Sequence, residues 1–87
     1  MEEKMNNKVE FSQLILGFST AALHYLGETS IKDREQRCQN LELAKQNIDI
    51  IEMLKAKTEG NLSPDEVKLI EQLLGDLHLK FVETKKL

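Results

Sequence analysis

The stretch Lys57-Thr-Glu-Gly60-Asn-Leu-Ser63-Pro64-Asp-Glu66-Val67 contains the residues that end one helix and begin the next. Gly60 supplies the positive φ with which helices commonly end. Ser63 is placed to cap the following helix, with Pro64 at its first position. Glu66 follows three residues after Ser63, which is the spacing of a capping box. So short a connection between two helices favours an antiparallel hairpin.

The helix before this turn is predicted over about residues 40–58. Its apolar positions form two stripes at helical spacing, one of Leu41, Ala44, Ile48 and Ile51 and one of Leu43, Ile50 and Leu54. Asn47 lies between the stripes, where its amide needs hydrogen-bond partners. Two interpretations of Asn47 remain open: a core amide bonded to a loop carbonyl, or a polar residue that fixes register or partner choice at a helix interface.

The start of this helix has two candidate positions. We favour Asn40 as the N-cap because the apolar periodicity begins only at Leu41. The segment Asp33-Arg-Glu-Gln36 also has capping-box spacing, and it would start the helix there instead.

The helix after the turn is predicted over about residues 64–83. Its apolar face has heptad spacing, which suits long near-antiparallel packing on the preceding helix, and it consists of Val67, Ile70, Leu73, Leu74, Leu77 and Phe81. Gly75, Leu79 and Val82 lie off this face and close to one another. A glycine inside a helix costs about 1 kcal/mol relative to alanine, which is tolerable where another backbone approaches. These three residues are therefore a candidate contact site, or else a neutral exposed glycine beside two isolated aliphatic residues.

The first helix is predicted over about residues 9–26, with Gly27 as its C-terminal cap. One broad stripe is enough to seat it on a core, and consists of Phe11, Leu14, Ile15, Phe18, Ala21, Ala22, Tyr25 and Leu26. Leu16 and Leu23 fall outside this stripe, one heptad apart, beside Ser12 and Ser19. A monomer would leave this second seam exposed to water, so the sequence predicts self-association, with a dimer favoured.

Length and composition indicate one soluble domain. We expect a disordered leader over residues 1–8, a helical domain over residues 9–83 and a frayed tail over residues 84–87. The 87 residues carry a net charge of −3 without a basic stripe, so nucleic acid is not an expected partner. Cys38 is the single cysteine, which excludes an internal disulfide and fits a reducing cytoplasm. The apolar run in the first helix is too short and too interrupted for a membrane span or signal peptide.

No residues point to catalysis, a cofactor or a metal site. His24 and His78 belong to no ligand pair on their own helices. Glu42, Asp49 and Glu52 share a face with basic and amide side chains, and such a face is more simply explained by exposure to solvent than by acid–base chemistry. We therefore expect no enzyme activity, although a deep pocket containing Asp49 or His78 would reopen that possibility.

Several segments together resemble a known family: Asn40–Leu54, Lys57-Thr58, Gly60-Asn-Leu62 and Glu66–Leu74. It is a family of short bacterial proteins described only as a domain of unknown function, whose members usually carry an arginine where this chain has His78. The resemblance implies a bacterial, cytoplasmic, helical protein and supplies no activity.

The sequence thus predicts an all-α fold, a three-helix protein with an antiparallel hairpin of the second and third helices, assembled as a homo-oligomeric helical bundle. Its expected function is a non-catalytic self-associating interaction or adaptor module with an unidentified protein client. A peripheral membrane or apolar-ligand binder using the first helix is the alternative, and an enzyme of unknown class is third. The candidate interface residues are Ser12, Leu16, Ser19, Leu23, Asn47, Gly75, Leu79 and Val82.

Overall fold

The computed structural model describes residues 10–27 and 33–85, and within them the chain forms three α-helices and no strand. The helices are α1 (Phe11–Gly27), α2 (Arg34–Lys57) and α3 (Pro64–Lys85). The all-α prediction is confirmed for this part of the chain. The expected leader over residues 1–8 and the last two residues of the expected tail lie outside the described residues.

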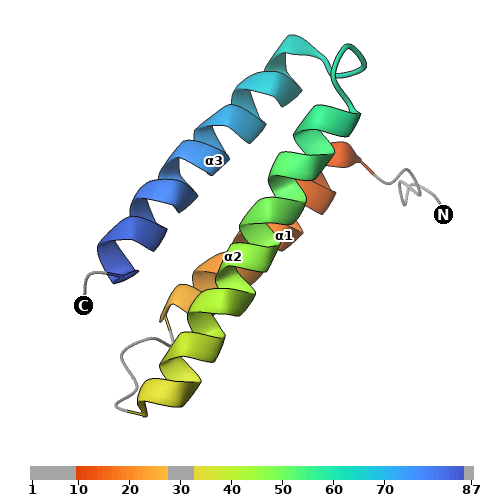
Figure 1. The fold of residues 1–87 in the computed structure, drawn as a ribbon. Helices are drawn as coiled ribbons and strands as arrows, with labels where there is room; N and C mark the ends of the chain where they lie inside the picture. The colour runs from red at the N-terminus through yellow and green to blue at the C-terminus, as the bar shows by residue number, and fades with distance from the viewer. Residues whose placement is uncertain (1–9, 28–32, 86–87) are drawn as a thin grey trace, which may run out of the picture.

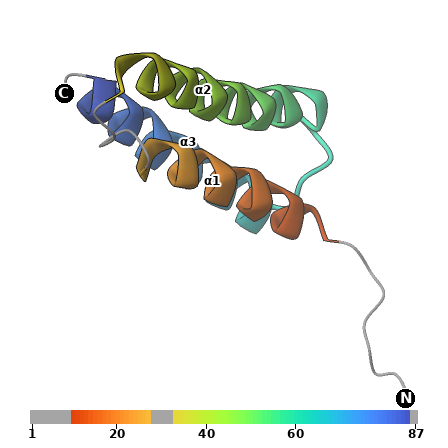
Figure 2. The same cartoon turned by 90° about the horizontal axis from the view of Figure 1, so that it is seen from below.

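The three helices pack side by side, and each contacts the other two. In Figure 1 the chain runs up along α2, passes through the loop and returns along α3, while α1 lies behind α2. Figure 2 turns the view by 90° and shows α2 above α1, with α3 behind. Every helix therefore turns one side inward and another outward. None of the three described helices is long and apolar enough to cross a membrane.

The core between the helices receives apolar side chains from all three. The buried cluster consists of Ile15, Ala22, Ile48, Ile51, Ile70, Leu74 and Leu77, with Phe11, Phe18, Leu54, Leu73 and Phe81 packed at its margin. Complete burial of an isoleucine or leucine side chain stabilises a fold by about 1.5–3 kcal/mol. The apolar positions with helical spacing therefore supply the main force that holds the three helices together.

The turn between α2 and α3 is built as its residue types predict. Gly60 has a φ of 88°. The Ser63 backbone N–H donates to Glu66 Oε1 at 2.9 Å, and the Glu66 backbone N–H donates to Ser63 Oγ at 3.2 Å. This reciprocal pair is a capping box, which satisfies two backbone donors and fixes where α3 begins.

The predicted start of α2 at Asn40 is wrong. Asp33 is the N-cap, and its Oδ1 accepts hydrogen bonds from the backbone N–H groups of Glu35 at 3.0 Å and Gln36 at 3.3 Å. Asn40 lies inside the helix and is buried. An N-cap needs no apolar periodicity, and the first turns of α2 extend beyond the core with mostly exposed polar side chains. For that reason the onset of apolar spacing marked the core and not the helix end.

Two other predicted helix ends need correction. Gly27 belongs to α1, and Gly60 is the single glycine with a positive φ among the described residues, so the left-handed cap predicted at Gly27 is wrong. At the other end, α3 continues beyond residue 83 to Lys85. Thr84 is buried because it follows Leu77 by seven residues and so repeats its inward position.

Candidate functional site

The predicted seam on α1 is only partly exposed. Leu16 and Leu23 are 45% and 48% exposed, whereas Ser12 is half-buried. Ser19 is 4% exposed, which contradicts its placement in a seam open to water. The reason is helical spacing, because Ser19 follows Ile15 by four residues and precedes Ala22 by three, on the side that faces the core. The exposed part of the seam is therefore the pair of leucines.

These leucines belong to a wider exposed surface, which we name the α1 outer face. It consists of the exposed residues Gln13, Leu14, Leu16, Gly17, Thr20, Leu23, His24 and Gly27. The whole of α1 contains no Asp, Glu, Lys or Arg. By contrast, nine of the 24 residues of α2 and eight of the 22 residues of α3 are charged. The outward side of α1 thus lacks the charged side chains that α2 and α3 carry.

A groove lies along the side of α1 that adjoins α2, and we name it the α1–α2 groove. It has a volume of about 370 Å³ and is lined by Gln13, Leu14, Gly17, Phe18, Ala21 and Asn47. Leu14 is 43% exposed at its edge. At 100° per residue, Leu23 projects about 180° from Leu14. Leu23 therefore lies on the opposite side of α1 from the groove. Leu16 projects in nearly the same direction as Leu23, also away from the groove.

The NH₂ group of the Asn47 side chain has a hydrogen-bond acceptor within its own helix. Its Nδ2 donates to the Leu43 carbonyl oxygen at 2.9 Å within α2, so the interpretation of Asn47 as an amide bonded to a loop carbonyl is wrong. The side chain is half-buried in the wall of the groove. Within residues 10–27 and 33–85, no donor reaches the Asn47 amide oxygen. Because Asn47 lines the groove, a molecule bound there would meet its side chain.

The candidate contact site on α3 is separate from the surface on α1. Leu79 and Val82 are 61% and 48% exposed, and Gly75 is also exposed. A Cβ added at Gly75 would meet nothing within 4 Å. Gly75 precedes His78 by three residues and Val82 follows it by four, so they share its side of the helix. His78 contacts α2, which places this site along the α2 edge of α3.

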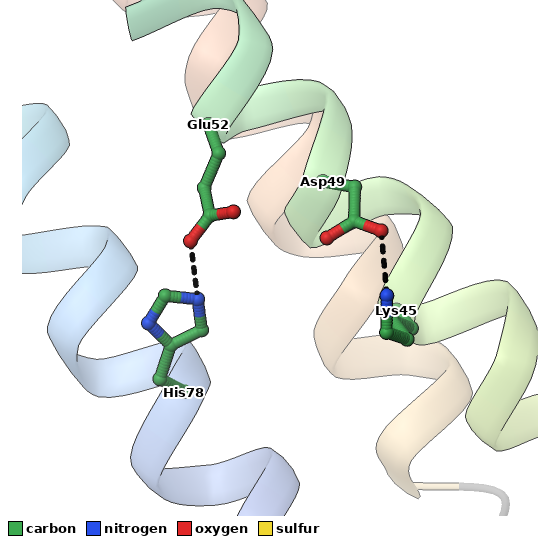
Figure 3. Close-up of polar contacts among 4 residues, drawn as sticks. All are labelled: Lys45, Asp49, Glu52 and His78. Atoms are coloured by element: carbon green, nitrogen blue, oxygen red, sulfur yellow. Dashed lines mark hydrogen bonds and ion pairs between the residues drawn. The ribbon is translucent and has the colours of Figure 1, made fainter.

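Polar side chains on α2 and α3 are paired with one another (Figure 3). His78 Nε2 lies 2.8 Å from Glu52 Oε2 and so links α3 to α2. Within α2, Lys45 Nζ lies 2.9 Å from Asp49 Oδ2, and this hydrogen bond raises the pKa of Lys45. All four side chains are about half exposed or more, and exposed pairs of this kind contribute little to stability.

A second hollow lies at the loop end of α2 and α3. It has a volume of about 390 Å³ and is lined by Glu52, Lys55, Ala56, Thr58, Glu59, Gly60, Leu62, Val67, Ile70 and Glu71. Lys55 Nζ lies 3.8 Å from Glu71 Oε2 across it. Neither this hollow nor the α1–α2 groove is lined by Asp49 or His78. Among the described residues, no group of three or more His, Cys, Asp and Glu is placed to hold a metal ion.

The fold and its surfaces define a small all-α protein whose first helix is free of charge and whose other two helices carry paired charges. The profile of the family "Domain of unknown function (DUF1844)" matches residues 8–83. The chain therefore belongs to this family, and the resemblance seen in the sequence is confirmed. No curated protein and no solved structure matches the chain.

Proposed function

We propose that this protein is a non-catalytic self-association module in which the α1 outer face of one copy docks on a second copy. The observation that carries the proposal is the absence of charge from α1, together with the large exposed fractions of Leu14, Leu16 and Leu23. Leu14 lies on one side of the α1 outer face and Leu16 and Leu23 on the other, with only uncharged residues between them. Large exposed surfaces rich in apolar side chains mark interaction sites.

A second copy suits this surface better than an arbitrary partner. In a twofold dimer the same surface meets itself, so a charge that lies near the axis approaches its own copy and is repelled. A surface without charges avoids that repulsion. The antiparallel hairpin of α2 and α3 would then form the back of each subunit, with its charges left in water and available to an unidentified protein client.

The first test is the absolute mass in solution, measured by light scattering coupled to size exclusion over a wide range of dilution. We expect a species with twice the 10.0 kDa mass of one chain that persists on dilution. A monomer at every concentration would contradict the proposal and leave the α1 outer face free for another partner.

A pair of substitutions tests whether α1 provides the contact. Leu16→Glu combined with Leu23→Glu places two carboxylates on the α1 outer face, so we expect a helical but monomeric protein. Met53→Glu is the matched control, because Met53 is 46% exposed on α2 and Leu16 is 45% exposed on α1. Circular dichroism confirms that the variants fold. If the double variant keeps the mass of the assembly, α1 is not the contact.

The competing function is binding to a membrane surface or to an apolar ligand through α1. Helices that lie in a membrane interface usually carry Lys and Arg on their polar side, and α1 carries neither. Co-sedimentation with anionic and neutral vesicles separates the two functions, and we expect no binding. We also propose a bacterial cytoplasmic location, supported by the unpaired Cys38 and by the family resemblance.

A further inference from the structure

We propose that two copies pack their α1 helices in parallel about a twofold axis, so that Leu16 of each copy enters the α1–α2 groove of the other. This inference rests on the proposed function, because it names the occupant of the α1 outer face and the orientation in which it binds. Its basis is the placement of an exposed leucine and a groove on opposite sides of one helix.

The leucine and the groove lie at the same height along α1. Gly17 is in the middle of the groove-lining residues of α1, which run from Gln13 to Ala21. Leu16 is the preceding residue, so the two lie about 1.5 Å apart along the axis. A twofold axis parallel to the helices places each residue at the same height as the identical residue of the second copy. It therefore sets Leu16 opposite the groove around Gly17.

The twofold axis also decides which sides of the helices meet. When the axis runs along two parallel helices, the left side of one helix faces the right side of the other. Leu16 then meets the groove, and the same contact occurs twice. When two helices are antiparallel, like sides meet, so leucine faces leucine and the two open grooves face each other. The parallel arrangement is the one that fills the groove with a side chain already exposed.

The row of residues between the leucine and the groove allows the helices to approach. Gln13, Gly17, Thr20 and His24 follow one another at intervals of four, three and four residues, which is the spacing of a coiled-coil seam. A Cβ added at Gly17 would meet nothing within 4 Å, so the space above the backbone there is open in the single subunit. None of the four residues brings a carboxylate, ammonium or guanidinium group to the contact.

The outward side of α1 supplies part of the surface that a small dimer needs. A helix with the 17 residues of α1 is about 26 Å long and about 10 Å wide, so its outward side presents about 260 Å² per subunit. Two such sides give about 520 Å². A specific interface of about 1,000 Å² therefore also takes in the neighbouring edge of α2, which forms one wall of the α1–α2 groove.

Cysteine cross-linking tests the orientation in the intact chain. Cys38 is exposed and is first replaced by Cys38→Ser. Gln13→Cys and His24→Cys are then made separately, near the two ends of α1, and each protein is mildly oxidised alone and as a mixture. Met53→Cys, on the outward side of α2, is the control. In the parallel dimer, Gln13→Cys and His24→Cys each form a covalent dimer alone, whereas Met53→Cys does not.

The outcomes separate the orientation from the proposed function. If neither variant links to itself but the mixture forms a mixed dimer, the helices are antiparallel and the inference is overturned. If no link forms while the uncrosslinked protein has the mass of a dimer, self-association stands and contact through α1 is overturned. A monomeric mass for the unmodified chain overturns both.

A second variant tests the leucine itself. Leu16→Ala removes the side chain that fills the groove and should weaken dimerisation about tenfold or more. Met53→Ala removes an apolar side chain of nearly the same exposure and should leave the dissociation constant unchanged. Equal effects of the two substitutions would show that Leu16 has no specific site in the partner.

Discussion

Gly75 and Gly17 are glycines in helix interiors with open space where a Cβ would stand. Neither adopts a positive φ, since Gly60 alone does so among the described residues. Nothing within the subunit therefore requires glycine at these two positions. They differ in their surroundings, because Gly17 lines the α1–α2 groove and Gly75 lies on the charged helix α3.

For Gly75 we predict that Gly75→Ala raises the free energy of unfolding by about 1 kcal/mol, the difference in helix propensity. Urea denaturation followed by circular dichroism measures it, with no change in the mass of the assembly. A lower mass would show that Gly75, Leu79 and Val82 form a contact between copies after all.

For Gly17 we predict a different result from the same substitution. Gly17→Ala should also raise helix propensity, but its methyl group occupies the groove that Leu16 of the second copy needs. The dissociation constant should therefore rise while the helical content stays the same. Sedimentation equilibrium measures it, with Gly75→Ala as the matched control. Dimers of equal strength for both variants would contradict a close approach at Gly17.

Asn47 provides the third prediction at this scale. Asn47→Leu removes an amide whose donor already bonds to the Leu43 carbonyl, so the helix should persist. If the amide oxygen helps to fix register, its loss should turn one defined species into a mixture of assemblies, as polar residues at helix interfaces do. Light scattering across the elution peak measures this. A single unchanged mass would assign Asn47 a role within the subunit alone.

At the scale of elements, the two N-caps show what a sequence specifies locally. The Ser63 box was predictable because glycine, serine, proline and glutamate coincide within seven residues. The Asp33 cap was harder to choose, because the residues that follow it are polar and its box competed with the onset of apolar spacing at Leu41. Local hydrogen bonding decided the helix start, while the apolar spacing decided only where the core begins.

The Asp33 cap leads to a prediction about the first turns of α2. Asp33→Ala should lower the free energy of unfolding by about 1 kcal/mol, because two backbone N–H groups lose their acceptor. Hydrogen exchange should quicken over residues 34–39 and stay slow at Ile48 and Ile51. Asp33→Asn keeps an acceptor oxygen and should behave nearly as the natural chain. Uniform loosening of α2 would contradict a local role for this cap.

At the scale of the whole molecule, helical spacing in the sequence predicted the core positions. It did not predict that the candidate interface residues would lie on different sides of the molecule. Ser19 turned inward because the core reaches around α1 farther than its apolar stripe suggested. Asn47 joined the α1–α2 groove, and the α3 site stayed on another side. Which sides of two helices adjoin depends on how they cross in three dimensions, and spacing along one chain does not contain that information.

The lack of charge on α1 leads to a prediction for the assembly as a whole. Salt screens contacts between charges and leaves apolar contacts nearly unaffected. The dissociation constant should therefore change by less than about twofold between about 50 mM and 500 mM NaCl. Binding of a client to the charged sides of α2 and α3 should weaken over the same range. Strong salt dependence of dimerisation would move the contact away from α1.

The order of the helices along the chain matters during synthesis. The uncharged α1 is made first, and the residues up to Lys57 that complete α2 follow it. At about 5–20 residues per second, roughly 2–6 s pass before that partner exists. During that time the apolar side chains of α1 are covered neither by the core of the subunit nor by a second copy. We therefore expect chaperones to bind the nascent chain. The yield of folded protein in cells should depend on the rate at which α2 is synthesised.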